Sequence, residues 1–299
     1  MNSEKFKRLD EHNINVSWQP KSDDYAAAVS EDDKIDINFS KILDGKVCLV
    51  TGASDGMGYT MAHLYAEHGA KLIITARRKE KLEAAAAKIA EETGAEVTPF
   101  VADASNKEDA RKVMAFIREK YGRLDTLVNN AGVGDQFRAE TATDDAIDSM
   151  VDINLKGPMY YCREALNLML PQNYGNIVNV SSVNGVRPLC GSSYSAAKGG
   201  LNTLTKSIAL RCVGTGVHCN ALCPGFTVTP LSLRQEAVDK GDAGLAPVGS
   251  DMIPILHKRS VRNVPTFPID QAMLALFLGS DMSRAITGQV IVCDNGQYL

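Results

Sequence analysis

Short runs of apolar and β-branched residues alternate along the chain with longer stretches in which apolar residues recur at helical spacing. The short runs are typical of strands and the longer stretches of amphipathic helices. Seven strands are predicted, at residues 46–50, 71–75, 96–101, 126–129, 176–180, 217–222 and 289–293. Helices are predicted between them at residues 57–68, 79–93, 106–121, 144–170 and 194–213. Because strands that alternate with helices build parallel βαβ units, the sequence predicts an α/β, doubly wound Rossmann fold, with a seven-stranded parallel sheet flanked by helices on both faces.

Two segments depart from this alternation. Residues 1–42 are polar, carry clusters of charge and show no sustained period, so we interpret them as an N-terminal extension. Its few apolar residues, Trp18 among them, favour packing onto the body or a partner subunit, and a floppy arm is the alternative. Residues 43–299 are expected to form a single catalytic domain. Within it, residues 229–270 are rich in Pro, Gly and Asp with only short helical possibilities, and we assign them to a loop that encloses the substrate.

Composition narrows the classes of function. The 299 residues are 44% hydrophobic and carry a formal charge of -4, so a nucleic-acid partner is not expected. No apolar run reaches the ~18 residues of a membrane span and the N-terminus has no signal-peptide pattern, so we expect a cytoplasmic protein with no membrane partner. The seven cysteines form no CxxC pair and are expected to be reduced core thiols. The segment that holds Cys219 and Cys223 is predicted to be a strand that runs into CPG, which does not favour a metal site.

A glycine-rich loop, TGASDGMG at 51–58, directly follows the first predicted strand and opens the first helix. Gly52 allows a tight turn, Gly56 lets the backbone approach a pyrophosphate, and Gly58 permits close helix packing. The N–H groups at the start of the helix suit an anion. The loop therefore predicts dinucleotide binding, and its other expected contacts with the cofactor are Ser54, Asp55 and Met57.

The end of the second predicted strand favours NADP(H) over NAD(H). An acidic side chain there would accept hydrogen bonds from the ribose of NAD, but the sequence has Ala76 followed by Arg77 and Arg78. A guanidinium group holds a 2′-phosphate well, whereas a solvated basic turn is the other interpretation. Asp55 opposes the assignment, because its carboxylate would weaken phosphate binding if it pointed inward.

Tyr194 and Lys198 stand four residues apart in YSAAK, so on a helix they lie on one face. A nearby ammonium favours phenolate and lowers the ordinary phenol pKa of ~10, which suits a general acid and base. A serine hydroxyl at the end of the fifth strand would stabilise a developing alkoxide. Ser181 and Ser182 both follow that strand, and since successive strand residues face opposite sides, we expect one of them to serve.

Several motifs in order resemble the short-chain dehydrogenase/reductase family: TGASDGMG at 51–58, NNAG at 129–132, Asn154 in INLKG, the serines at 181–182, YSAAK at 194–198 and CPG at 223–225. The resemblance covers residues 44–299. It implies interconversion of a secondary alcohol and a ketone, with Tyr194 exchanging the proton and Lys198 also holding the nicotinamide ribose. Ser182 is preferred because SVNG begins with it, although the family's usual spacing to Tyr194 counts back to Ser181.

The resemblance also implies a water chain from Asn154 to Lys198, and a homo-oligomer, a tetramer or a dimer. The helices at 144–170 and 194–213 would form one interface and the last strand another. The remaining residues that the resemblance places at the cofactor are Asp103, beside the adenine, Asn130 and Gly132, beneath the adenosine ribose, and Gly225, Thr227 and Thr229, facing the nicotinamide carboxamide.

The substrate stays open among hydroxysteroids or bile acids, sugar acids or polyols, and 3-oxoacyl compounds. A non-catalytic nucleotide-binding redox sensor is one alternative function, against which Tyr194, Lys198, Ser182 and Asn154 all argue. A sugar-nucleotide epimerase or dehydratase is the other. It normally needs a larger region after the last strand than the sequence shows.

Overall fold

The computed structural model describes residues 38–135, 137, 139–229, 232 and 265–297. The chain divides into two units after Phe39, and every element described below belongs to the second unit, which begins at Ser40. Residues 1–37 of the expected extension and most of the expected substrate loop lie outside the described residues.

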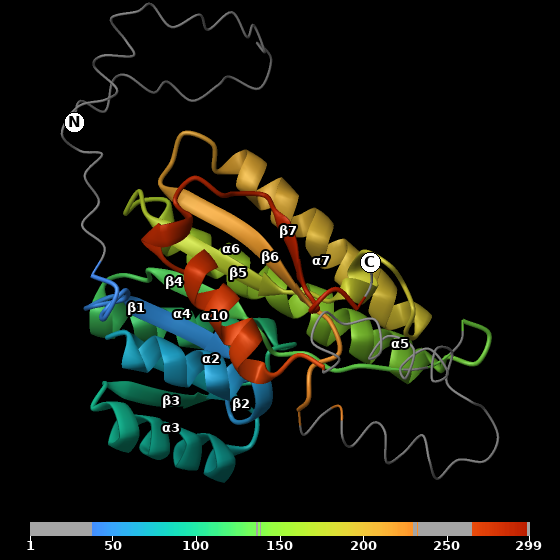
Figure 1. Ribbon diagram of the computed structural model, residues 1–299, viewed down its shortest axis with the longest axis horizontal. Coiled ribbons are helices and arrows are strands. Elements are labelled where there is room, and N and C mark those ends of the chain that lie inside the picture. Colours follow the sequence, from blue (N-terminus) through green and yellow to red (C-terminus); the bar gives the residue numbers. More distant parts are fainter. Residues whose placement is uncertain (1–37, 136, 138, 230–231, 233–264, 298–299) are drawn as a thin grey trace, which may run out of the picture. The chain divides into compact units, whose positions relative to one another are not determined.

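Seven strands form one parallel sheet in the order β3-β2-β1-β4-β5-β6-β7 (Figure 1). The strands are β1 (Val47–Thr51), β2 (Lys71–Ala76), β3 (Val97–Val101), β4 (Thr126–Asn129), β5 (Gly175–Val180), β6 (Val217–Pro224) and β7 (Val290–Cys293). The predicted parallel sheet is thus confirmed. The direction of winding reverses between β1 and β4, and ligands of open α/β sheets bind at such a point, beyond the carboxyl ends of the strands.

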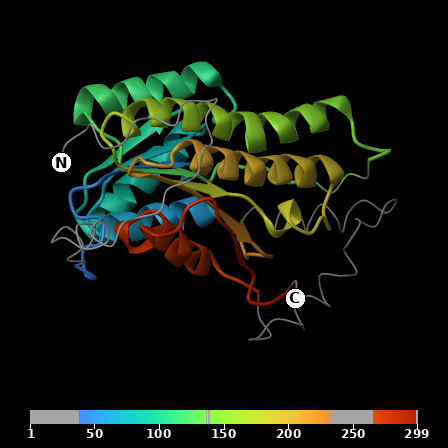
Figure 2. The ribbon, with the colours of Figure 1, turned by 90° about the horizontal axis from the view of Figure 1, so that it is seen from above.

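Helices lie on both sides of the sheet (Figure 2). They are α2 (Gly56–Glu67), α3 (Lys79–Thr93), α4 (Lys107–Tyr121), α5 (Asp144–Val151), α6 (Gly157–Met169), α7 (Ser192–Arg211) and α10 (Pro268–Leu278). None of these described helices is long and apolar enough to cross a membrane.

The alternating side chains of the strands supply two separate cores. On β1, Cys48 and Val50 pack with α2, α3 and α10 on one face of the sheet. Val47 and Leu49 point the other way and pack with α4, α6 and α7. Because both faces are buried, β1 is apolar at nearly every position instead of at every second one.

The structure differs from the prediction in one helix and in one loop. The predicted helix 144–170 is interrupted by a π-helical turn, η2 (Asp152–Lys156), between α5 and α6. A π turn is a single widened turn inside a helix. The segments before and after it each keep helical spacing, so the whole stretch was predicted as one helix. The predicted loop 229–270 ends earlier than expected, because α10 begins at Pro268.

Helix α10 escaped prediction because PIDQAMLALFL is apolar on nearly all sides and has little helical period. Local signals for its start are present. Pro268 occupies the first helical position, and the side chain of Asp270 accepts a hydrogen bond from the backbone N–H of Phe267 at 2.7 Å.

A buried hydrogen bond ties α10 to α2. The Tyr65 hydroxyl donates to the carbonyl of Ala275 at 2.6 Å, and the side chain is fully buried. Replacing Tyr65 with Phe is expected to lower the free energy of unfolding by ~1 kcal/mol, because this bond is lost without replacement by water. Denaturant unfolding measures the difference. Tyr121→Phe, which removes a bond to the exposed Glu96, is the control and should cost less; equal losses in the two variants would contradict the prediction.

Candidate active site

A cleft of about 470 Å³ opens beyond the carboxyl ends of the strands, where the winding reverses. Most of the predicted site residues line it, namely Gly52, Ser54, Asp55, Gly56, Met57, Gly58, Arg77, Arg78, Asp103, Asn130, Gly132, Asn154, Tyr194, Lys198 and Thr229. Ser181 also lines the cleft, whereas Ser182, Gly225 and Thr227 are not among its lining residues. The structure therefore brings residues that follow six strands, β1 to β6, into one site.

The glycine loop turns sharply and packs closely against the turn after β4. Gly52 has a φ of +67°, and a Cβ there would lie 2.7 Å from the Cα of Ala131. Gly56 has a φ of +58° and begins α2. Asp55 occupies the N-cap position, but its side chain makes no capping hydrogen bond. The first-turn N–H groups of α2 are thus not capped by Asp55, and they are donors suited to phosphate oxygens.

The turn after β4 is locked to the glycine loop by Thr51. The Thr51 hydroxyl accepts hydrogen bonds from the backbone N–H groups of Asn130 at 3.0 Å and Ala131 at 3.1 Å. The Asn130 side-chain amide donates in return to the carbonyls of Thr51 at 2.9 Å and Gly52 at 3.2 Å. The sequence analysis did not single out Thr51, although it is the first residue of the TGASDGMG motif. Its hydroxyl fixes the spacing between the two loops that form the cleft floor.

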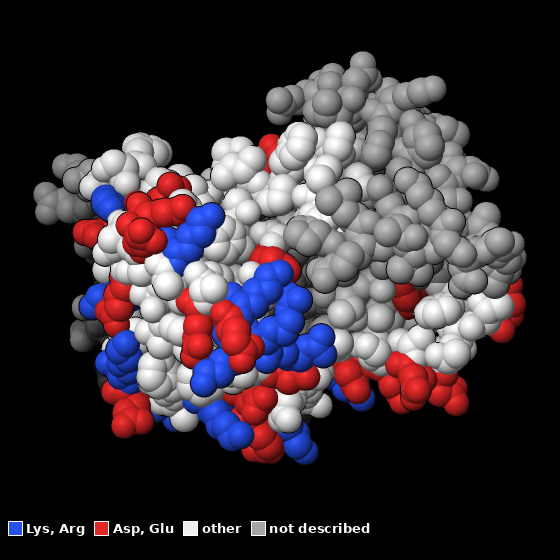
Figure 3. Space-filling view, turned by 90° about the horizontal axis from the view of Figure 1, so that it is seen from below, with Lys and Arg blue, Asp and Glu red and all other residues white. Residues whose placement is uncertain are grey.

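Opposite charges are paired at the end of the cleft beside β2. The Asp55 carboxylate accepts a hydrogen bond from the Lys81 ammonium and another from the Arg78 guanidinium at 3.1 Å. Burial would raise the pKa of Asp55, but Lys81 and Arg78 outweigh burial and lower that pKa. Lys81 was missed by the sequence analysis, since it lies on α3 beyond the expected basic pair. Acidic and basic side chains also lie interspersed on the face shown in Figure 3.

The second basic residue of this end, Arg77, lies 4.0 Å from the carboxylate of Asp103. Asp103 itself accepts hydrogen bonds from the backbone N–H of Ser105 at 2.9 Å and from its hydroxyl at 2.7 Å. The Asp103 side chain is therefore fixed at the rim of the cleft, next to the turn after β3.

Tyr194 and Lys198 lie on the first turns of α7 and face the same cleft. The Lys198 Nζ atom is 5.8 Å from the centre of the Tyr194 ring and donates to the carbonyl of Val180 at 2.8 Å. Lys198 is buried, and burial lowers its pKa to about 8. The tertiary structure thus holds an ammonium beside the phenol, as the spacing predicted.

Asn154 lies in the π turn η2 and is fully buried. Its amide donates to the carbonyls of Val133 at 3.0 Å and Met150 at 3.1 Å, and its Oδ1 accepts the N–H of Val133 at 3.3 Å. A Cβ on Gly132 would lie 2.9 Å from that Oδ1 and 3.5 Å from the Nζ of Lys198. A Cβ on Gly132 would therefore crowd the Asn154 side chain, while Lys198 would lie at an ordinary contact distance.

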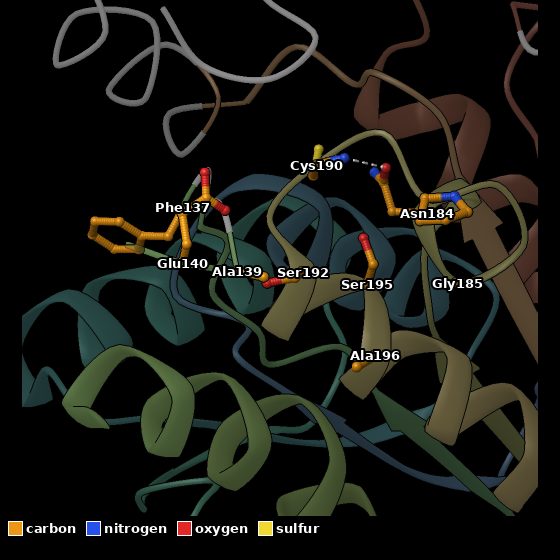
Figure 4. A pocket seen from close by; sticks show the side chains of 10 residues that line it. Phe137, Ala139, Glu140, Asn184, Gly185, Cys190, Ser192, Ser195 and Ala196 are labelled. Carbon is orange, nitrogen blue, oxygen red and sulfur yellow. Dashed lines mark hydrogen bonds between the residues drawn. The ribbon is translucent and has the colours of Figure 1, made fainter. Parts of the chain in front are cut away.

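The two serines after β5 have different partners. The Ser181 hydroxyl donates to the carbonyl of Lys198 at 3.1 Å. The Ser182 hydroxyl instead accepts two hydrogen bonds from Asn184, from its backbone N–H at 3.1 Å and its side-chain amide at 3.2 Å. The Asn184 Oδ1 also accepts the N–H groups of Leu189 and Cys190, both at 2.9 Å, and so fixes the loop that leads to α7 (Figure 4). Sequence reasoning missed Asn184.

The residues expected at the carboxamide do not all reach the cleft. Thr229 lines it, but the Thr227 hydroxyl is buried against that of Thr266 at 2.8 Å. Gly225 packs against Asp294, whose Cα would lie 2.9 Å from a Cβ at position 225. These contacts hold the segment after β6 against Thr266 and Asp294 of the same chain.

A second, shallower cavity of about 650 Å³ lies at the start of α7. Its lining residues are Phe137, Ala139, Glu140, Asn184, Gly185, Pro188, Cys190, Ser192, Ser195 and Ala196. Figure 4 shows these residues from close by. None of the predicted catalytic residues is among those that line this cavity.

Asp135 is a buried carboxylate under the first turn of α7 that sequence reasoning also missed. The carbonyls of Asp135 and Phe137 accept the N–H groups of Gly191 and Ser192, each at 3.3 Å. A Cβ on Gly191 would overlap the Asp135 carboxylate, so Gly191 must lack a side chain. Burial raises the pKa of Asp135, although the amides of Phe137 and Tyr194 lower it in part.

The raised pKa of Asp135 predicts a pH-dependent stability. A carboxylate whose folded pKa exceeds the unfolded value of ~3.9 costs stability once it ionises, and the full cost is present above the folded pKa. Asp135→Asn should therefore raise Tm at ~pH 8, and the gain should shrink as the pH falls towards ~4. Thermal unfolding at several pH values measures it, with the exposed Asp148→Asn as control. A constant difference between Asp135→Asn and wild type at all pH values would contradict the assignment.

Comparison with known proteins identifies the family of the chain. Residues 46–239 match the family model described as short chain dehydrogenase. The chain is 37% identical over 263 residues to the 3beta-hydroxysteroid dehydrogenase of Mediterraneibacter gnavus, covering 85% of this chain and 95% of the relative. It is 34% identical over 255 residues to the 3-oxoacyl-[acyl-carrier-protein] reductase of Thermotoga maritima, covering 85% and 98%. The crystal structure of levodione reductase superposes with a TM-score of 0.78 at 30% identity, covering 85% and 98%. The chain belongs to the short-chain dehydrogenase family, oxidoreductases that act on alcohol and ketone substrates with a nicotinamide cofactor.

Proposed function

We propose that this protein is an NADP(H)-dependent oxidoreductase that interconverts a secondary alcohol and a ketone with Tyr194 as general acid and base. The observation that carries the proposal is the buried Lys198 ammonium, 5.8 Å from the Tyr194 ring, in a cleft that runs to Arg77 and Arg78.

The residues of the cleft fit a dinucleotide. Gly52 and Gly58 leave no room for a Cβ, so the backbone of the loop stays close to any ligand beside it. The start of α2 offers N–H donors to the pyrophosphate. Asp103 and Asn130 would border the adenosine, and Thr229 the carboxamide. When bound, the cofactor supplies or accepts the hydride.

The protein's own part in the reaction is proton transfer and charge stabilisation. In reduction, the Tyr194 hydroxyl donates its proton to the carbonyl oxygen, and the Lys198 ammonium stabilises the phenolate that remains. In oxidation the phenolate takes the proton back from the alcohol. Because the pKa of Lys198 is lowered to about 8, the ammonium is retained near neutral pH and lost in mildly alkaline solution. Asn154 would hold the water chain through which Lys198 exchanges protons.

Ser182 is the proposed donor to the substrate oxygen. The Ser181 hydroxyl already donates its proton to the carbonyl of Lys198. Since the Ser182 oxygen accepts both of its bonds from Asn184, its own proton is left for a bond to an alkoxide.

The ketones to be tested as substrates come from the classes that the sequence leaves open and from the names of the relatives. A 3-keto steroid, a 7-keto bile acid, a ketose and a 3-oxoacyl thioester cover them. A homo-oligomer is part of the proposal, and its interface would cover Leu210, which is 73% exposed, and Met159, which is 44% exposed.

Tyr194→Phe is expected to lower kcat for reduction of an accepted ketone by at least ~100-fold, because the proton donor is lost. The reaction is followed by the loss of reduced-cofactor absorbance. Tyr160→Phe, on α6, is the control and should leave kcat near that of the wild type. Full turnover by Tyr194→Phe would rule out the mechanism.

The choice of serine is tested by paired alanine variants. Ser182→Ala should lower kcat by ~100-fold or more, because the bond to the developing alkoxide is lost. Ser181→Ala should cost much less, because it removes a bond to the Lys198 carbonyl. The opposite order of effects, measured with the same ketone, would transfer the role to Ser181.

A further inference from the structure

The start of α7 receives no cap from its own N-cap residue. That residue is Gly191, which has no side chain to offer to the first-turn N–H groups. An N-cap side chain ordinarily accepts a hydrogen bond from the second or third residue of its helix. The third residue of α7 is Tyr194, the proposed general acid and base. The order of this first turn therefore bears on the position of the reacting phenol.

The carboxylate of Asp135 occupies the place of the missing cap. A Cβ on Gly191 would overlap its Oδ1, so the two groups share one position. The Asp135 side chain is 7% exposed, and among the residues that the structure describes neither of its oxygens has a hydrogen-bond partner. Burial raises the pKa of Asp135, and the backbone N–H groups of Phe137 and Tyr194 act in the opposite direction. The carboxylate is thus close enough to the third residue of α7 to be stabilised by its N–H dipole.

The segment around Asp135 also connects the helix start to the buried asparagine of the cleft. The backbone N–H of Gly191 donates to the carbonyl of Asp135 at 3.3 Å. Two residues earlier, the N–H and carbonyl of Val133 bond to the Asn154 side chain at 3.3 and 3.0 Å. A continuous run of contacts therefore leads from Asn154 through this segment to the helix that carries Tyr194.

A carboxylate in this position is costly for the fold. Burying a charge without a hydrogen-bond partner lowers stability, and an apolar side chain would avoid that cost. Stability alone therefore gives no reason for an aspartate at position 135. The helix above it gives one, because proteins keep such costly groups mainly where function needs them.

We propose that Asp135 is a positioning residue that caps α7 from a distant part of the chain and so fixes Tyr194 in the cleft. This role rests on the proposed function, in which Tyr194 is the general acid and base. Asp135 is not among the residues that line the cleft. Its effect reaches the reaction through the first turn of α7.

Moving the cap from one position to the other tests the proposal. Asp135→Ala should lower kcat for an accepted ketone by ~10-fold or more, because a displaced reacting group costs at least that much. The KM for the ketone should change by less than ~2-fold. Gly191→Ser alone should also lower kcat, because its Cβ meets the Asp135 carboxylate.

The double variant, Asp135→Ala with Gly191→Ser, should recover the activity. The serine then has room, and the backbone at this position, with φ of -52° and ψ of 145°, suits a serine N-cap. Its kcat should return to within ~3-fold of the wild type, since serine and aspartate cap helices about equally well. Asp135→Asn, which keeps an acceptor oxygen in place, should also stay within ~3-fold.

A second measurement needs no turnover. Backbone hydrogen exchange at the start of α7 should quicken by ~5-fold in Asp135→Ala and slow again in the double variant, because a cap stabilises the first turn. Asp148→Ala, which removes an exposed carboxylate on α5, is the matched control and should change neither the exchange nor kcat.

Two results would overturn the proposal. One is an unchanged kcat in Asp135→Ala, even where hydrogen exchange responds to the loss of the cap. The other is a loss of kcat that the double variant does not repair, because Asp135 would then act by packing alone. Tyr194→Phe keeps the proposed function distinguishable. Full turnover by that variant removes the role of Tyr194, whereas an inactive Tyr194→Phe beside an unaffected Asp135→Ala removes the role of Asp135 alone.

Discussion

The close approach of the loops after β1 and β4 is the constraint on which the site depends. Gly52 adopts a left-handed backbone conformation and has no room for a Cβ against Ala131. The Thr51 hydroxyl and the Asn130 amide then bond the two loops in both directions. Because the sheet winds away in opposite directions from these two strands, their ends leave a cleft that neighbouring helices do not fill.

Close packing also shapes the end of the cleft that holds Tyr194 and Lys198. Asn154 and Lys198 reach Gly132 from different elements, and each is buried with polar partners on the backbone. Burial makes the charged form of Lys198 costly, which is the reason for its lowered pKa. A lysine tuned in this way holds its charge less firmly than a surface lysine does. That property suits the role proposed for Lys198, which is to stabilise the Tyr194 phenolate and to exchange protons with water.

At the other end of the cleft, beside β2, basic and acidic side chains form ion pairs. The local charge there depends on these pairs and not on the net charge of the chain. Arg77, Arg78 and Lys81 would by themselves make a strongly basic pocket, but Asp55 and Asp103 lie against them. These two carboxylates offset part of the positive charge that the three basic side chains bring to this end of the cleft.

The sequence by itself determined the sheet, most of the helices, the glycine loop and the pairing of Tyr194 with Lys198. These features depend on local spacing: strand and helix periods, a strand-loop-helix junction, and residues one helical turn apart. It did not reveal α10, whose sides are nearly all apolar, or the π turn that carries Asn154. Only the tertiary structure decided that Asp55 turns towards Lys81 and that Asp135 lies under Gly191. These contacts join residues far apart in the chain, and their geometry follows from how the elements pack, which no local pattern records.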